Sequence, residues 1–86
     1  MVFPPVYFQV MQTMEDFILE GDFIELNKLL KITGLCPSGG MAKAVIAEGK
    51  VKVDDKVELR KRRKIRAGQA VEFEGHKINV KNTSVT

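Results

Sequence analysis

The chain has 86 residues, and its composition, 44% hydrophobic and 29% charged, is typical of one globular domain rather than of a disordered chain. A single cysteine excludes an internal disulfide, and no apolar run approaches the roughly 20 residues of a membrane span. The net charge of +3 is unevenly divided: residues 1–49 hold three basic and six acidic residues, whereas residues 50–86 hold eleven basic and five acidic residues.

The excess of positive charge in the second part suggests a polyanionic partner, either a phosphate backbone or a membrane surface. The first residues do not resemble a signal peptide, so we expect a soluble, cytoplasmic protein. Residues 1–14 begin with Pro4-Pro5 and show only weak alternation, which predicts a flexible N-terminal arm. Residues 15–20 fit either a short strand or one helical turn. We expect the folded domain at residues 15–81 and a polar C-terminal tail at 82–86.

The first clear helical pattern starts at Asp22, because Asp22 and Glu25 have the spacing of a capping box. Gly34 is well placed to end this helix in the left-handed conformation. One apolar stripe is formed by residues at three- and four-residue steps, namely Phe23, Leu26, Leu29 and Leu30.

A second helix is predicted at residues 41–48, with Ser38 as its N-cap and Gly49 at its end. Its buried face consists of Ala42, Val45 and Ile46, and the short connection makes the two helices a hairpin.

After Gly49 the hydrophobic period changes to two, which is typical of half-buried strands. Strands are expected over residues 50–53, on the return through Val57 and Leu59, at 71–73 and at 76–80, with tight turns at Asp54-Asp55 and Glu74-Gly75. The sequence therefore predicts an α+β domain in which a two-helix hairpin packs on a small, mostly antiparallel sheet of three to five strands.

The strongest chemical feature is the stretch of residues 60–66, called the basic segment below. Its six cations in seven residues are Arg60, Lys61, Arg62, Arg63, Lys64 and Arg66. Arginine offers forked hydrogen bonds to phosphate, and each phosphate contact releases counterions, which favours binding to a polyanion. The alternatives are a solvated charged loop or, for residues 61–64, a nuclear-localisation address.

Two further groups extend this interpretation. Ser38-Gly39-Gly40 at a helix start offers free amides to an anion, and Lys43 follows one turn later; the alternative is an ordinary capped turn. Lys50 and Lys52 share one face of a strand and add to a basic surface, or else form a solvated face.

Nothing in the sequence indicates catalysis. One histidine, His76, and one cysteine, Cys36, supply neither a metal-ligand set of the usual kind nor a convincing triad, and no phosphate-loop motif is present. We therefore expect no enzyme activity, no cofactor, no metal and no small-molecule substrate.

The pieces, taken in order, resemble the ribosomal protein S-four RNA-binding domain, or alpha-L motif. Residues 24–31 resemble its first helix, residues 38–43 and 49–54 its second helix and first strand, and residues 60–65 its basic strand. The resemblance covers residues 17–80 and is strongest to the stand-alone bacterial YbcJ-like branch.

This resemblance implies single-domain RNA binding by one surface, with contacts from Ser38, Gly39, Gly40, Lys43, Lys52, Arg60, Arg62 and Lys64. The sequence departs from the family at Glu25, where a basic residue is common, and at Asp54-Asp55, where Asn-Gly is common. Both departures weaken inferences about base contacts and leave the phosphate-reading face intact.

We predict a monomer that binds structured RNA, ribosomal or tRNA-like, by shape and phosphate contacts. Reading of bases is not supported, because no exposed aromatic pair is evident. The alternative is an accessory module whose basic face meets an acidic protein.

Overall fold

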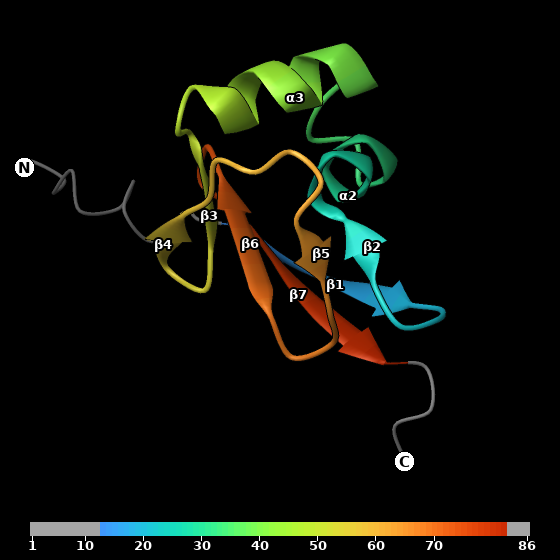
Figure 1. Cartoon of the computed structure of the whole chain (residues 1–86). Coiled ribbons are helices and arrows are strands. Elements are labelled where there is room, and N and C mark those ends of the chain that lie inside the picture. The colour runs from blue at the N-terminus through green and yellow to red at the C-terminus, as the bar shows by residue number, and fades with distance from the viewer. Residues whose placement is uncertain (1–12, 83–86) are drawn as a thin grey trace, which may run out of the picture.

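The computed structural model describes residues 13–82 (Figure 1). Helices α2 (Leu26–Ile32) and α3 (Gly39–Ala47) stand together above a five-stranded sheet of order β1-β7-β6-β3-β4. The strands of that sheet are β1 (Thr13–Leu19), β3 (Val51–Val53), β4 (Lys56–Val57), β6 (Ala70–Phe73) and β7 (His76–Asn82). A second sheet pairs β2 (Ile24–Glu25) with β5 (Lys64–Ile65). The expected α+β architecture, a helical hairpin on a mostly antiparallel sheet, is confirmed.

Strand β1 includes residues 15–19, for which the sequence allowed either a strand or a helical turn. It pairs with β7 in parallel, whereas the other pairs of the main sheet are antiparallel. Alternation along β1 supports this pairing, because Leu19 is buried and Phe17 packs against the core while Ile18 is exposed. The strand starts at Thr13, two residues before the expected domain boundary; residues 1–12 and 83–86 lie outside the described part of the chain.

The start of the first helix is the main correction to the sequence analysis. Helix α2 begins at Leu26 and not at Asp22, and its N-cap residue, Glu25, makes no side-chain capping bond. The capping box does not form because Ile24 and Glu25 are strand residues that pair with β5.

Long-range backbone contacts take the place of that cap. The amide of Leu26 donates to the carbonyl of Arg63 at 2.9 Å, and the amide of Asn27 donates to the carbonyl of Lys61 at 3.1 Å. These donors belong to the first turn of a helix, where amides have no partner within the helix. The basic segment therefore caps α2 with its backbone.

The rest of the apolar stripe follows the prediction, with one exception. Leu26, Leu29 and Leu30 are fully buried. Phe23, in contrast, lies outside the helix and is 39% exposed. Gly34 adopts a φ of +84° just after the helix, the left-handed conformation that glycine accommodates without strain.

Helix α3 is close to its prediction: it starts two residues earlier, at Gly39, and ends one residue earlier, at Ala47. The hydroxyl of Ser38 accepts a hydrogen bond from the amide of Met41 at 3.2 Å, as an N-cap does. The predicted inner face is buried and consists of Ala42, Val45 and Ile46.

The sheet follows the period-two pattern of the sequence. Val51 and Val53 are buried while Lys52 is exposed, and Asp54 and Asp55 turn the chain with φ values of 52° and 70°. The return strand is shorter than expected, because β4 ends at Val57 and leaves Leu59 in the following loop, both side chains being exposed.

No helix within residues 13–82 is long and apolar enough to cross a membrane.

Candidate nucleic-acid interface

The path of the basic segment is fixed by the fold. Ile65, in the middle of the cations, is fully buried and pairs with Ile24 across the small sheet. The carbonyls of Lys61 and Arg63 accept the amides of α2, as described above. The buried Ile65 and the backbone hydrogen bonds thus fix the segment in place. Of its cations, Arg63 is half-buried, and the exposed ones are Arg60, Lys61, Arg62, Lys64 and Arg66.

One carboxylate, Glu58, organises the start of the segment. Its side chain is 11% exposed and accepts hydrogen bonds from Arg60 Nε at 2.9 Å, from Arg60 Nη2 at 3.2 Å and from Arg63 Nη1 at 3.2 Å. The amide of Arg60 donates to the same group at 3.0 Å. The side-chain hydrogen bond from Arg60 is the largest of the effects that lower the pKa of Glu58, although burial opposes it. Glu58 therefore stays ionised and orients two guanidinium groups.

Five of the predicted residues converge on one shallow hollow, called the basic depression. Its lining consists of Arg60, Arg62, Arg63, Lys64 and Arg66. No acidic side chain contributes to this lining, and although Glu58 pairs with Arg60 and Arg63, the hollow presents an excess of positive charge to the solvent.

Lys50 and Lys52 occupy a different environment. They line a second hollow together with Glu72 and Glu74, and Lys50 forms an ion pair with Glu48 at 3.1 Å. Acidic neighbours weaken the attraction of these two lysines for an anion.

The residues at the start of α3 line neither hollow; they are its N-cap Ser38 and the helical residues Gly39, Gly40 and Lys43. The C-terminal end of α3, and not the end that holds Ser38, lies next to the chain that leads into the basic segment. A Cβ on Gly49, just after this end, would meet Val57 and Leu59 at 3.7 and 3.8 Å. Nine helical residues separate the two ends by roughly 13 Å. The predicted residues thus form three groups, and a role in RNA contact stays a prediction for each.

Phe23 is the residue of interest that the sequence analysis missed. The Nζ atom of Lys64 lies 4.8 Å from the centre of its ring, and the guanidinium carbon of Arg66 lies 5.7 Å away. These distances are those of cation–π contacts. Arg66 Nη1 also donates to the carbonyl of Asp22 at 3.4 Å, which ties the loop before β2 to the basic segment. The sequence analysis assigned Phe23 to the buried face of a helix. Its place at the surface depends on the pairing of β2 with β5, which joins distant parts of the sequence.

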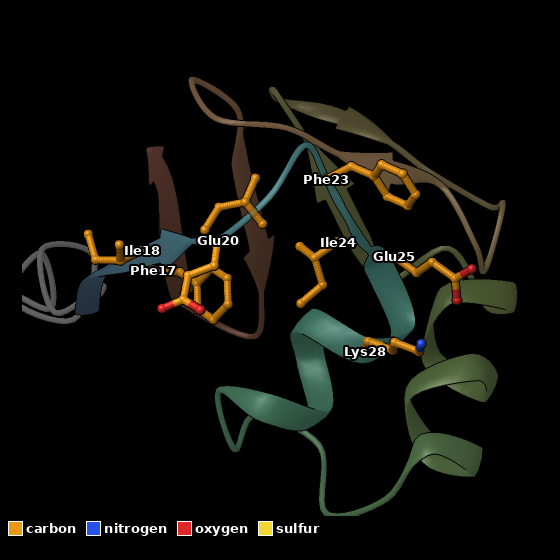
Figure 2. A pocket seen from close by; sticks show the side chains of 8 residues that line it. Phe17, Ile18, Glu20, Phe23, Ile24, Glu25 and Lys28 are labelled. Atoms are coloured by element: carbon orange, nitrogen blue, oxygen red, sulfur yellow. The ribbon is translucent and has the colours of Figure 1, made fainter. Parts of the chain in front are cut away.

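A further hollow, the β1–α2 depression, lies beside Phe23. Figure 2 shows Phe17 and Phe23 on its two sides with Ile24 between them. Its polar lining comes from Glu20, Glu25 and Lys28, so an apolar surface is combined with two carboxylates and one ammonium group.

The remaining candidates for chemistry lie apart from these surfaces. Among residues 13–82 no group of three His, Cys, Asp or Glu side chains is placed to hold a metal ion. Cys36 is buried in the core, and burial is the main cause that raises the pKa of its thiol.

The fold and the surface together define a class of protein: a helical hairpin beside a small sheet, with clustered cations on the strand and loop that cap the first helix. The chain belongs to the S4 domain family, whose model matches residues 17–81.

Relatives of known sequence and structure agree with this membership. The chain is 58% identical over 57 residues to YbcJ of Escherichia coli, named as a candidate RNA-binding protein, and the match spans 66% of this chain and 81% of that protein. It is 39% identical over 57 residues to RlbA of Bacillus subtilis, named as a candidate ribosome maturation protein, across 66% of this chain and 80% of that protein. The solution structure of Escherichia coli YbcJ, described as having an alpha-L motif involved in RNA binding, matches with a TM-score of 0.59 and 47% identity over 81% of this chain and 87% of that chain.

Proposed function

We propose that this protein binds structured RNA through the basic segment and acts without catalysis. The observation that carries the proposal is the anchoring of six cations on a path fixed by buried Ile65 and by the start of α2, with Glu58 as the acidic partner. Clustered cations at fixed positions match the regular phosphates of an RNA helix, which proteins recognise by shape and backbone.

The ion pairs with Glu58 leave the two arginines able to bind phosphate. A guanidinium group has five N–H donors, of which Arg60 uses two on Glu58 and Arg63 uses one. The remaining donors of each fork are available to a phosphate oxygen. Glu58 thereby reduces the conformational freedom that these side chains would otherwise lose on binding.

The names of the relatives support a choice of partner for this binding. The name of the Bacillus subtilis relative refers to ribosome maturation, so we propose ribosomal RNA as the first RNA to test. The proposal places the protein in the cytoplasm, as a single copy, and includes neither a membrane nor a small-molecule substrate. Chemical change of an RNA by the isolated chain would contradict the non-catalytic role.

The test compares two double variants of equal charge. Lys61→Ala with Arg62→Ala removes two exposed cations of the basic segment, and Lys31→Ala with Lys77→Ala removes two cations elsewhere. Binding to a ribosomal RNA hairpin should weaken by about 1 kcal/mol per contact in the first variant, roughly thirtyfold in Kd, and the slope of log K against log salt should fall by about two. The control pair should change Kd and slope much less.

Two results would contradict the proposal. Equal losses in both double variants would mean that total charge, and not the basic segment, determines binding. A salt slope near zero for the wild-type protein would exclude phosphate contacts, and the alternative of an acidic protein partner would then be the one to test.

A further inference from the structure

Phe23 is an exposed aromatic side chain in a position that the fold maintains. The loop before β2 turns at Gly21, whose φ of +102° is a conformation that other residues rarely adopt. Ile24, the next residue after Phe23, packs against the core, so the neighbouring Phe23 side chain is left at the surface. Phe23 is 39% exposed, so part of its ring remains available to a ligand.

The surroundings of the ring combine two kinds of surface. Lys64 and Arg66, both in the lining of the basic depression, make cation–π contacts with the ring. The ring also belongs to the lining of the β1–α2 depression, together with the apolar Phe17 and Ile24 and the polar Glu20 and Glu25 (Figure 2). Phe23 is therefore the point at which a phosphate-binding surface meets a hollow with an apolar lining.

We infer that Phe23 stacks on an unpaired base of the bound RNA, and that this base enters the β1–α2 depression. The inference rests on the proposed function and specifies it further: the RNA would be a hairpin or bulge, with paired phosphates on the basic depression and an unpaired base on the ring. Protein aromatics and arginine planes commonly hold unstacked RNA bases in this way.

Each neighbour of Phe23 has a role in this arrangement. The cations of Lys64 and Arg66 neutralise the phosphates next to the stacked base and keep the RNA backbone near the ring. Glu25, which Figure 2 shows on the Phe23 side of β2, supplies acceptors for amino or imino groups at the edge of the base, and Lys28 supplies donors. The ring contributes a stacking surface, which any of the four bases can use.

The experiment compares an RNA hairpin with the same hairpin carrying abasic loop nucleotides. Both RNAs have the same number of phosphates, so any difference between them measures the contribution of the loop bases. Wild-type protein should bind the abasic hairpin roughly tenfold more weakly than the complete one, and Phe23→Ala should abolish that difference. Phe23→Leu, which retains apolar bulk without an aromatic face, should behave like Phe23→Ala, whereas Phe23→Trp should restore the difference.

The tryptophan variant also reports directly on stacking. The chain contains no tryptophan, so Phe23→Trp introduces a single indole whose fluorescence a stacked base would quench. We expect the complete hairpin to quench this fluorescence and the abasic hairpin to leave it almost unchanged at saturation.

The outcomes separate this inference from the function on which it rests. If wild-type protein binds neither RNA, the proposed function fails and the inference with it. If it binds both RNAs equally tightly, or if Phe23→Ala weakens both by the same factor, RNA binding stands and base stacking is wrong. The second case would show that Phe23 only positions Lys64 and Arg66.

Discussion

The two helices of the hairpin begin in different ways. Helix α3 is capped locally, since Ser38 accepts the amide of Met41 three residues later. Helix α2 is capped from a distance, since the carbonyls of Lys61 and Arg63 accept its first amides. The first kind of start depends on one side chain, whereas the second depends on the whole path of the basic segment. The comparison shows that the segment proposed to bind RNA is also part of the frame of the fold.

Removing the buried anchor of the basic segment should have the largest effect. Ile65→Ala leaves a cavity beneath the small sheet and is expected to lower the free energy of unfolding by about 2–5 kcal/mol, as other large-to-small core changes do. Chemical denaturation measures this loss. Leu59→Ala, at an exposed position in the loop after β4, should change the value by less than about 0.5 kcal/mol.

Equal effects of the two substitutions would mean that Ile65 does not anchor the segment. The start of α2 would then not depend on the basic segment, and the contrast between the two helices would disappear.

Replacing Glu58 should have an intermediate effect that depends on pH. Glu58→Gln weakens the hydrogen bonds to Arg60 and Arg63 and is expected to cost about 1 kcal/mol at neutral pH, a value kept small by the exposure of Arg60. The pKa of Glu58 is lowered in the folded protein, chiefly by the hydrogen bond from Arg60. Its contribution is therefore complete above the ordinary carboxyl pKa of about 4.3 and is lost as the pH falls through the lower folded value.

Measuring the free energy of unfolding from neutral to acidic pH checks the predicted direction of this pH dependence. The difference in stability between wild type and Glu58→Gln should shrink as the pH falls below about 4.3. A difference that grows in acid would show that the ionised carboxylate destabilises the fold.

The smallest effects test the caps themselves. Ser38→Ala removes the exposed local cap of α3 and should cost about 0.5 kcal/mol of unfolding free energy. Asp22→Ala should cost almost nothing, because Asp22 lies outside α2 and its predicted capping box does not form. Thermal unfolding of the two variants distinguishes them, and a similar loss in both would restore the helix start that the sequence suggested.

Features determined by neighbouring residues could be predicted from the sequence. The cap at Ser38, the turn at Asp54-Asp55 and the alternation of Val51 and Val53 each depend on a few adjacent side chains. The period-two and helical patterns were therefore sufficient for the α+β fold.

Features determined by distant residues could not be predicted in this way. The pairing of β2 with β5 joins Ile24 to Ile65. Because of this pairing, the start of α2 and the position of Phe23 both differ from the prediction. The parallel pairing of β1 with β7 is equally long-range. For the candidate site, the cations of residues 60–66 were evident from composition, whereas their separation from Lys50, Lys52 and α3 needed the three-dimensional arrangement.

The two carbonyls that cap α2 restrict this part of the chain to changes of one kind. Because Lys61 and Arg63 contribute backbone oxygens at 3.1 and 2.9 Å, their side chains can be exchanged without loss of either bond, whereas deleting one residue would move both oxygens out of register. Length is thus constrained at both positions. Side-chain identity is free only at Lys61, because Arg63 also hydrogen-bonds Glu58.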